Sequence, residues 1–394
     1  MTVLEARAQD LTRLSEEPFD LVVVGGGITG AGVLLDAASR GLRAALIERD
    51  DLASGTSSRS SKLIHGGLRY LEQYRFGLVR EALAERAVLL RTAPHLVHIA
   101  PFLAPVYGSP FQVPYLGAGM TLYGLLGAAR DGGFPRYLRP SSARRAHQSL
   151  RPEGLQGGFV YHDGVDDDSR LVVTVVRTAQ AAGALAVTRI RATALLTEAG
   201  SVCGLELQDA LDGASVRVTT RRVVDATGAT GGAGGPFARQ GGGAHVTPSL
   251  GIHLVVARDR IPGEVGLTIR VPGRVVFLVP WGRFWIIGTT DHPYTGPTDR
   301  PHASPAEVDE LLNAINTTMD VGLRREDLIA TYAGVRPLAG DDSGSTVRAS
   351  REHVIGEPVP GLITIRGGKY TTYRRIAMEA VSYTHLTLPT NREV

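Results

Sequence analysis

The chain has 394 residues, 43% apolar and 21% charged, a composition that excludes a disordered or fibrous protein. Its 42 basic and 39 acidic side chains leave a net charge of +3, which gives no reason to expect a nucleic-acid partner. A single cysteine, Cys203, excludes an internal disulfide and a cysteine-rich metal site, and we expect no bound metal. The length predicts more than one domain.

The N-terminal part of the sequence predicts a strand, a helix and a second strand. Residues 19–24 and 44–47 are short apolar runs typical of buried parallel strands, and residues 30–39 between them have helical character. Residues 1–17 lack the apolar stretch of a signal peptide. The segment is therefore a βαβ unit, which is common in nucleotide-binding domains.

A glycine-rich turn follows the first of these strands. Gly25, Gly27 and Gly30 fit the G-x-G-x-x-G pattern, in which glycines let backbone N–H groups approach a pyrophosphate. Glu48 ends the second strand, where an acidic side chain can bind a ribose hydroxyl. These residues predict a dinucleotide site and leave NAD and FAD open. A later strand at residues 223–226, running into a turn of small residues, favours a flavin domain.

The second half of the sequence changes character. Residues 251–257, 275–280 and 284–287 resemble strands, and the short turn between the last two predicts an antiparallel hairpin. Ser304 to Glu307 form a capping box with proline at the first helical position, which predicts a helix. We therefore expect an α/β fold with a Rossmann-like, parallel-sheet cofactor domain and an antiparallel-sheet substrate domain.

One uncharged segment has two interpretations. Residues 92–129 contain no Asp, Glu, Lys or Arg, and an arginine-rich stretch follows them. Prolines exclude one long helix, but residues 116–126 predict an apolar helical stripe. The segment is either buried between domains or rests on an anionic bilayer surface.

The most distinctive block is residues 56–70, which brings paired glycines together with a histidine, an arginine and a tyrosine. Three further blocks follow at residues 279–291, 332–338 and 367–374. From about Phe19 to Ala380 the chain resembles the FAD-dependent glycerol-3-phosphate dehydrogenases of the glycine-oxidase-like flavoprotein superfamily. The resemblance implies FAD as cofactor and sn-glycerol 3-phosphate as substrate, oxidised at C2 to dihydroxyacetone phosphate, with a quinone or oxygen as electron acceptor.

The resemblance also implies the site residues. The catalytic set is His65, Arg69, Arg336 and Lys369, and the substrate-binding set is Arg69, Tyr70, Arg336, Arg351 and Lys369. The cofactor set is Gly25, Gly27, Gly30, Glu48, Thr56, Ser57, Ser58, Lys62, Leu63, Gly66, Gly228, Gly368 and Thr371. Guanidinium forks suit a phosphate dianion, and a histidine can accept the hydroxyl proton.

Two roles stay open at this point. His65 is the candidate base, but it could instead hydrogen-bond the flavin or the backbone. Lys369 and Lys62 are the only lysines in a chain rich in arginine. Lys369 could bind the substrate, or it could stabilise the negative charge of reduced flavin.

The family pattern also predicts the organisation of the chain. We expect a discontinuous FAD-binding domain of residues 18–90, 150–235 and 335–381, and a substrate domain of residues 91–149 and 236–334. The family's further C-terminal helical domain is expected to be absent, with residues 382–394 forming a truncated or foreign tail. The expected location is cytoplasmic, peripheral on the inner face of the plasma membrane, and a homodimer is compatible with the sequence. The alternatives are a flavin amine or amino-acid oxidase, or an inactive FAD-binding fragment.

Overall fold

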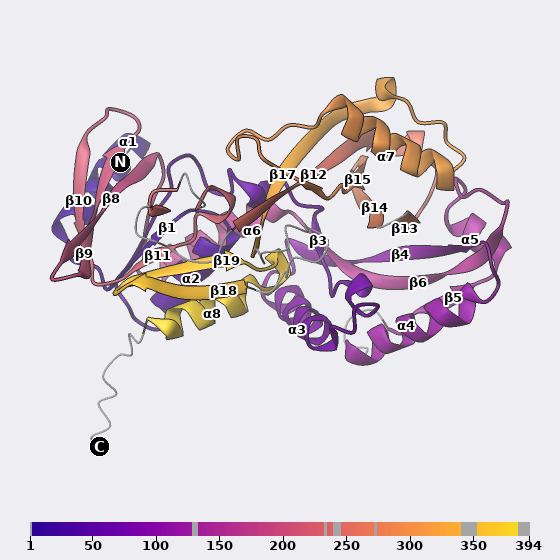
Figure 1. Cartoon of the computed structure of the whole chain (residues 1–394), viewed down its shortest axis with the longest axis horizontal. Coiled ribbons are helices and arrows are strands. Elements are labelled where there is room, and N and C mark those ends of the chain that lie inside the picture. Colours follow the sequence, from indigo (N-terminus) through magenta and orange to yellow (C-terminus); the bar gives the residue numbers. More distant parts are fainter. Residues whose placement is uncertain are drawn as a thin grey trace, which may run out of the picture.

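The computed structural model describes residues 2–127, 133–231, 235–238, 246–271, 274–339 and 353–384, apart from the side chains of Val3, Arg69 and Ala339. The chain forms two lobes, with the cofactor-binding lobe on the left of Figure 1 and a larger sheet on the right. We call the right-hand lobe the cap.

The cofactor-binding lobe is built on a six-stranded, mainly parallel sheet. Its order is β18-β19-β11-β1-β2-β7, and only the β18–β19 pair is antiparallel. The strands are β1 (Leu21–Val24), β2 (Ala44–Ile47), β7 (Leu185–Val187), β11 (Val223–Asp225), β18 (His353–Val359) and β19 (Leu362–Gly367). The parallel centre explains why the apolar runs are continuous, because both faces of these strands are covered.

Side chains of β1 show how the two faces are covered. Leu21 and Val23 pack in the same core as residues of α2 (Ile28–Ser39), α6 (Asp168–Ala181) and α8 (Tyr373–Tyr383). Val22 and Val24 lie in a second core with a three-stranded antiparallel sheet. That sheet comprises β8 (Ile190–Glu198), β9 (Ser201–Asp209) and β10 (Ser215–Thr219), beside which α1 (Val3–Glu16) packs. The lobe therefore has three layers.

The cap is a ten-stranded, mainly antiparallel sheet, in which β17 pairs with β12 and β5 with β6. Its strands are β3 (Leu63–Ile64), β4 (Val97–Tyr107), β5 (Arg136–Leu138), β6 (Leu155–Asp166), β12 (Val246–Ala257), β13 (Gly266–Val271), β14 (Arg274–Trp281), β15 (Phe284–Gly288), β16 (His292–Pro293) and β17 (Leu328–Ala339). Helix α7 (Pro305–Thr318) covers one face, and α3 (Phe76–Thr92) and α4 (Gln112–Leu126) cover the other (Figure 1). The short helix α5 (Pro140–Ala146) lies at the far end (Figure 1).

The expected fold class is confirmed, with small differences at element ends. The hairpin β14–β15 and the capping box at the start of α7 are both present. Helix α2 begins at Ile28 and not at Gly30, because Gly27 already occupies the extended N-cap position. Within the described ranges, no helix is long and apolar enough to span a bilayer.

The sheet pairings bear on the expected domain limits, which remain our interpretation. We placed residues 150–235 with the cofactor-binding lobe, but β6 pairs along its length with β4 in the cap sheet. The chain therefore enters the cofactor-binding lobe after Asp166. Similarly, β17 carries the chain through residue 335 while still paired with β12. Helix α8 runs to Tyr383, and residues 385–394 of the expected tail lie outside the described residues.

Candidate cofactor and substrate site

Gly25, in the turn between β1 and α2, and Gly30, in the first turn of α2, leave no space for a side chain. Gly25 has a φ of +114°, and a Cβ there would lie 2.6 Å from the carbonyl oxygen of Ala226. A Cβ on Gly30 would lie 1.9 Å from the carbonyl oxygen of Gly25. The turn is therefore packed backbone against backbone, and it brings the N-terminal N–H groups of α2 to the carboxyl edge of the parallel sheet. That arrangement fits a pyrophosphate.

Glu48 lies directly beside this turn. Its buried carboxylate accepts hydrogen bonds from the backbone N–H groups of Gly26 (2.6 Å) and Asp50 (2.8 Å). Burial raises the pKa of Glu48 above its ordinary value, and the two N–H donors oppose that rise. The side chain is thus fixed at the end of β2, where it fits a ribose hydroxyl.

A buried ion pair shapes the neighbouring turn after β11. The guanidinium of Arg366 donates to Asp225 (2.6 Å) and to the carbonyl oxygen of Gly231 (3.1 Å). Asp225 also accepts the hydroxyl of Thr227 (2.5 Å). Gly228 begins the short helix that follows, with a φ of +60°. These bonds fix the chain that follows β11 at the carboxyl edge of the sheet, beside the glycine turn.

A cavity of about 590 Å³ lies between the cap sheet, α4 and the segments at residues 56–74 and 368–371. Eight of the predicted site residues line it: Thr56, Leu63, His65, Tyr70, Arg336, Gly368, Lys369 and Thr371. These residues come from three separate parts of the sequence. Their convergence at one cavity follows from the fold and not from any local pattern.

Several of these residues are in direct contact. The backbone N–H of His65 donates to the hydroxyl of Thr371 (3.3 Å). The ammonium of Lys369 lies 3.9 Å from the centre of the Tyr70 ring, a cation–π distance. A histidine, a tyrosine and a cation therefore share one wall of the cavity.

Arg336 enters the cavity from β17. Its guanidinium donates to the hydroxyl of Thr289 (2.8 Å) and to the carbonyl oxygen of Thr290 (3.2 Å), and it lies 3.6 Å from the carboxylate of Asp291. Two hydrogen-bond acceptors and one ion-pair partner, all directly after β15, thus fix the direction of the fork. Such a preset guanidinium suits bidentate binding of a phosphate.

The sequence analysis missed His253, which lines the cavity from β12. Its Nε2 is 2.8 Å from the hydroxyl of Ser61, and its ring stacks on Tyr332 with centres 4.7 Å apart. Burial, with Arg336 and Lys62 nearby, lowers the pKa of His253 well below its usual value, so the ring is neutral at neutral pH. In the sequence His253 stands within a continuous apolar run, as a core residue would, and its place at the cavity becomes visible only from the pairing of β12 with β17.

Other predicted residues do not line this cavity, or they lie outside the part of the chain that the structure describes. The ammonium of Lys62 is buried against Asp168, and the N–H of Gly66 donates to the Tyr123 hydroxyl (2.9 Å). The carbonyl oxygen of Ser58 accepts a hydrogen bond from the ammonium of Lys62. The side chain of Arg69 and the whole of Arg351 are outside the described residues, so their roles stay predictions.

Together, the glycine turn of a parallel sheet and a cation-lined cavity under an antiparallel cap define a two-domain dinucleotide-binding oxidoreductase. A family model described as FAD dependent oxidoreductase matches residues 20–374. The chain therefore belongs to the FAD-dependent oxidoreductase family, and FAD is its cofactor.

Curated relatives give a finer comparison. The chain is 45% identical over 378 residues to a glycerol-3-phosphate dehydrogenase of Mycobacterium leprae, covering 96% of this chain and 65% of that protein. It is 39% identical over 395 residues to the human mitochondrial glycerol-3-phosphate dehydrogenase, covering 95% of this chain and 54% of that one. The chain thus spans roughly half to two thirds of the length of these relatives.

Solved structures agree on the fold. The glycerol-3-phosphate dehydrogenase of Bacillus halodurans, complexed with FAD, matches with a TM-score of 0.78 and 30% identity, over 96% of this chain and 66% of that one. Glycine oxidase from Geobacillus kaustophilus matches with a TM-score of 0.72 and 19% identity, over 96% and 99% of the two chains. The second likeness concerns the fold alone.

Proposed function

We propose that the chain oxidises sn-glycerol 3-phosphate at C2 to dihydroxyacetone phosphate, with FAD taking the hydride. The observation that carries this proposal is the meeting of Arg336, Lys369 and His65 at one cavity beside the residues that fit FAD. The relatives named for this substrate support the same assignment.

The reaction removes a hydride from C2 and a proton from the hydroxyl group that C2 carries. When bound, FAD supplies the acceptor for the hydride that leaves C2, and the hydroxyl proton must leave as the carbonyl forms. His65 accepts that proton, because a histidine can act as a base near neutral pH. Arg336 binds the phosphate, and Lys369 adds a second positive charge near the reacting oxygen or the reduced flavin.

The charge of the cavity favours phosphate over a simple carboxylate. Arg336 and Lys369 both line it, and a dianion suits two cations better than a single carboxylate does. An amine or amino-acid oxidase of this family would need one carboxylate-binding arginine. The substrate preference therefore separates the two activities.

The electron acceptor is a quinone in this proposal. Beyond the polar residues, the cavity continues along α4 between apolar side chains, among them Phe76, Tyr115, Leu116 and Leu122. A ring with an apolar tail suits such a lining better than a charged soluble acceptor does. Oxygen as the acceptor would not need an apolar approach.

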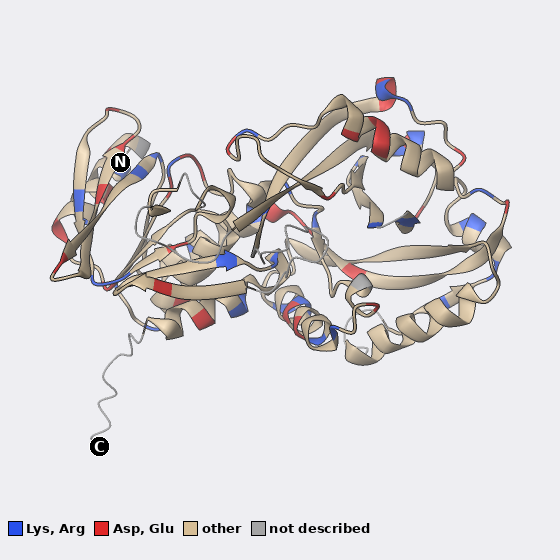
Figure 2. Ribbon diagram, in the orientation of Figure 1, with Lys and Arg blue, Asp and Glu red and all other residues tan. Residues whose placement is uncertain are grey.

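Helix α4 also supports a peripheral contact with the cytoplasmic face of the plasma membrane. It carries no charged residue, so its ribbon is tan throughout in Figure 2. Met120 and Tyr123 are buried in the cap, whereas Phe111, Tyr115 and Leu125 are 84%, 62% and 59% exposed. The segment thus combines both interpretations of the sequence: one side packs in the core, and the other presents apolar side chains as an interfacial helix does.

The test is the visible spectrum of the purified protein under anaerobic conditions, before and after adding sn-glycerol 3-phosphate. Bleaching of the flavin by this substrate, but not by glycine or sarcosine, is the expected result. Bleaching by the amino acids alone would replace the proposal with an amine oxidase, and bound flavin that nothing reduces would indicate an inactive fragment.

The membrane contact is tested separately, by binding of the protein to anionic vesicles. Loss of this binding in high salt would support an electrostatic membrane contact, and no binding at all would remove the proposed contact.

A further inference from the structure

The loop at residues 55–62 connects the two halves of the site. At one end the hydroxyl of Ser57 accepts the N–H of Ile28, the first residue of α2 beside the glycine turn (2.9 Å). At the other end, Ser60 and Ser61 line the cavity. The shape of this loop therefore decides how the glycine turn and the cavity are placed relative to each other.

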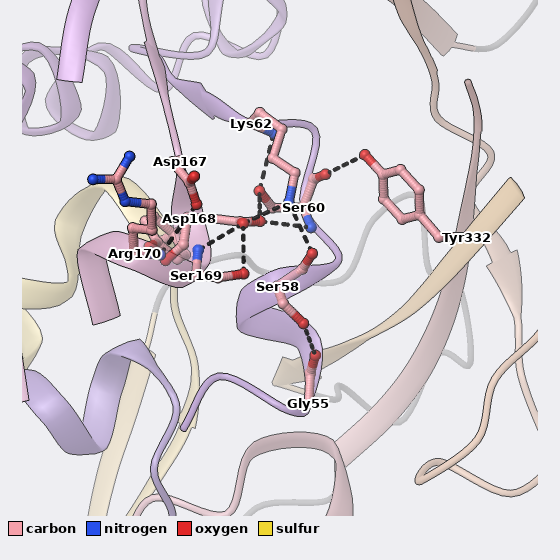
Figure 3. A network of polar contacts seen from close by, with 10 residues as sticks. Gly55, Ser58, Ser60, Lys62, Asp167, Asp168, Ser169, Arg170 and Tyr332 are labelled. Carbon is pink, nitrogen blue, oxygen red and sulfur yellow. Dashed lines mark hydrogen bonds and ion pairs between the residues drawn. The ribbon is translucent and has the colours of Figure 1, made fainter. Parts of the chain in front are cut away.

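The carboxylate of Asp168, at the start of α6, holds this loop from the side of the cofactor-binding lobe. One oxygen accepts both the backbone N–H (3.2 Å) and the hydroxyl (2.7 Å) of Ser60. The other accepts the ammonium of Lys62 at 2.5 Å, as Figure 3 shows. Asp168 is fully buried and so is its bond to Lys62, whereas the bonds to Ser60 are partly buried at the edge of the cavity.

Lys62 is held in an uncommon state. Its backbone φ is +57°, a left-handed conformation that non-glycine residues rarely adopt. Its buried ammonium also donates to the carbonyl oxygen of Ser58 (2.8 Å), four residues earlier in the same loop. Such a conformation persists only where surrounding contacts hold it, and a buried ammonium requires a buried partner.

The cap holds the same loop from the other side. The hydroxyl of Tyr332 donates to the carbonyl oxygen of Ser60 (2.8 Å), and Ser61 contacts His253. Three consecutive residues of the loop, Ser60 to Lys62, are thus fixed by contacts from both lobes.

We propose that Asp168 is a positioning residue for the cofactor: through Lys62 and Ser60 it sets the shape of the 55–62 loop on which FAD binding depends. Lys62, on this view, contributes to FAD binding by holding the loop and not by contacting the cofactor. The inference rests on FAD binding alone and is independent of which substrate the enzyme oxidises.

The test compares Asp168→Asn with the matched control Asp167→Asn. Asp167 precedes Asp168 and caps α6 by accepting the N–H of Arg170 (3.1 Å), a bond that asparagine can also make. The affinity for FAD is measured from the rise in free flavin fluorescence when the purified holoenzyme is diluted. We expect Asp168→Asn to raise the Kd for FAD by about tenfold or more, because it leaves the Lys62 charge buried without its counter-charge. Asp167→Asn should stay within about twofold of the wild type. An unchanged Kd in Asp168→Asn would overturn the proposal.

A second variant keeps the proposal testable if Asp168→Asn does not fold. Lys62→Met combined with Asp168→Leu removes both charges together, a replacement that buried ion pairs often tolerate without loss of stability. We expect this variant to fold but to keep a weakened affinity for FAD, since Ser60 has lost its acceptor. Recovery of stability together with wild-type affinity would mean that the pair serves folding alone. Bleaching of the wild-type flavin by sn-glycerol 3-phosphate is a separate readout, so failure of this proposal and failure of the proposed function are distinguishable.

Discussion

In the function that we propose, the two walls of the site recognise their ligands by different means. On the cofactor side, Gly25 and Gly30 pack against neighbouring carbonyl oxygens, so the surface that we propose for FAD is backbone. On the cap side, Arg336 and His253 project from strands, and other side chains fix their direction. Backbone recognition tolerates no added atoms, whereas side-chain recognition can be changed one group at a time. Variants on the two walls should therefore separate cofactor binding from chemistry.

The largest effect is expected on the cofactor side, for Gly30→Ala. The new Cβ would lie 1.9 Å from the carbonyl oxygen of Gly25, so the turn must move. We expect the purified protein to have lost most of its flavin, corresponding to about 3 kcal/mol or more of binding free energy, measured as the ratio of flavin to protein absorbance.

Gly77→Ala is the matched control for that change, because it introduces the same methyl group in α3, where nothing lies within 4 Å. It should keep its flavin. A full complement of FAD in Gly30→Ala would contradict the view that the backbone shape of this wall recognises the cofactor.

The next largest effect is expected on the cap side, for Arg336→Lys. Lysine keeps the charge but loses the fork that Thr289 and Thr290 orient. We expect kcat/KM for sn-glycerol 3-phosphate to fall by about a hundredfold, with the flavin content unchanged. Arg325→Lys, at an exposed pair with Asp309, should leave both unchanged. Loss of flavin in Arg336→Lys would contradict this separation, because a change in the cap would then also weaken cofactor binding.

The contrast also shows what the sequence could and could not predict. The glycine turn, the strand before it and Glu48 lie within some thirty residues, and their spacing reflects local geometry, so they were predicted. The partner of Lys62 lies 106 residues away, and no local pattern connects the two. His253 lies within a continuous apolar run of β12, which is the pattern of an ordinary core strand. Pairing of β6 with β4, which bears on the expected domain limit at residue 150, likewise depends on long-range register that periodicity does not specify.

A comparable effect is expected for one of the two histidines that line the cavity, His65 and His253. His65→Asn should slow flavin reduction by about a hundredfold and remove the fall in rate at acid pH, since the base is gone. His253→Asn should slow it by about tenfold or less and keep that fall, because the lowered pKa of His253 means that it does not titrate there. Stopped-flow reduction across a pH series measures both. The opposite assignment of the acid limb would make His253 the base.

The last prediction concerns the pH dependence of stability, at Asp166, which lies outside both walls of the site. Its side chain is buried, neither carboxylate oxygen has a hydrogen-bond partner among the described residues, and burial, with a smaller contribution from Asp168, raises its pKa from 3.8 to about 8. Between these values the folded protein holds a proton that the unfolded chain releases. Stability of the wild type should therefore fall as pH rises toward 8, by up to about 1.4 kcal/mol per pH unit from this group. Asp166→Asn removes that slope, so its free energy of unfolding relative to the wild type should increase from pH 5 to pH 8 in denaturant titrations. The exposed Asp299→Asn serves as the control, and an equal slope in all three proteins would show that Asp166 is ionised in the folded state.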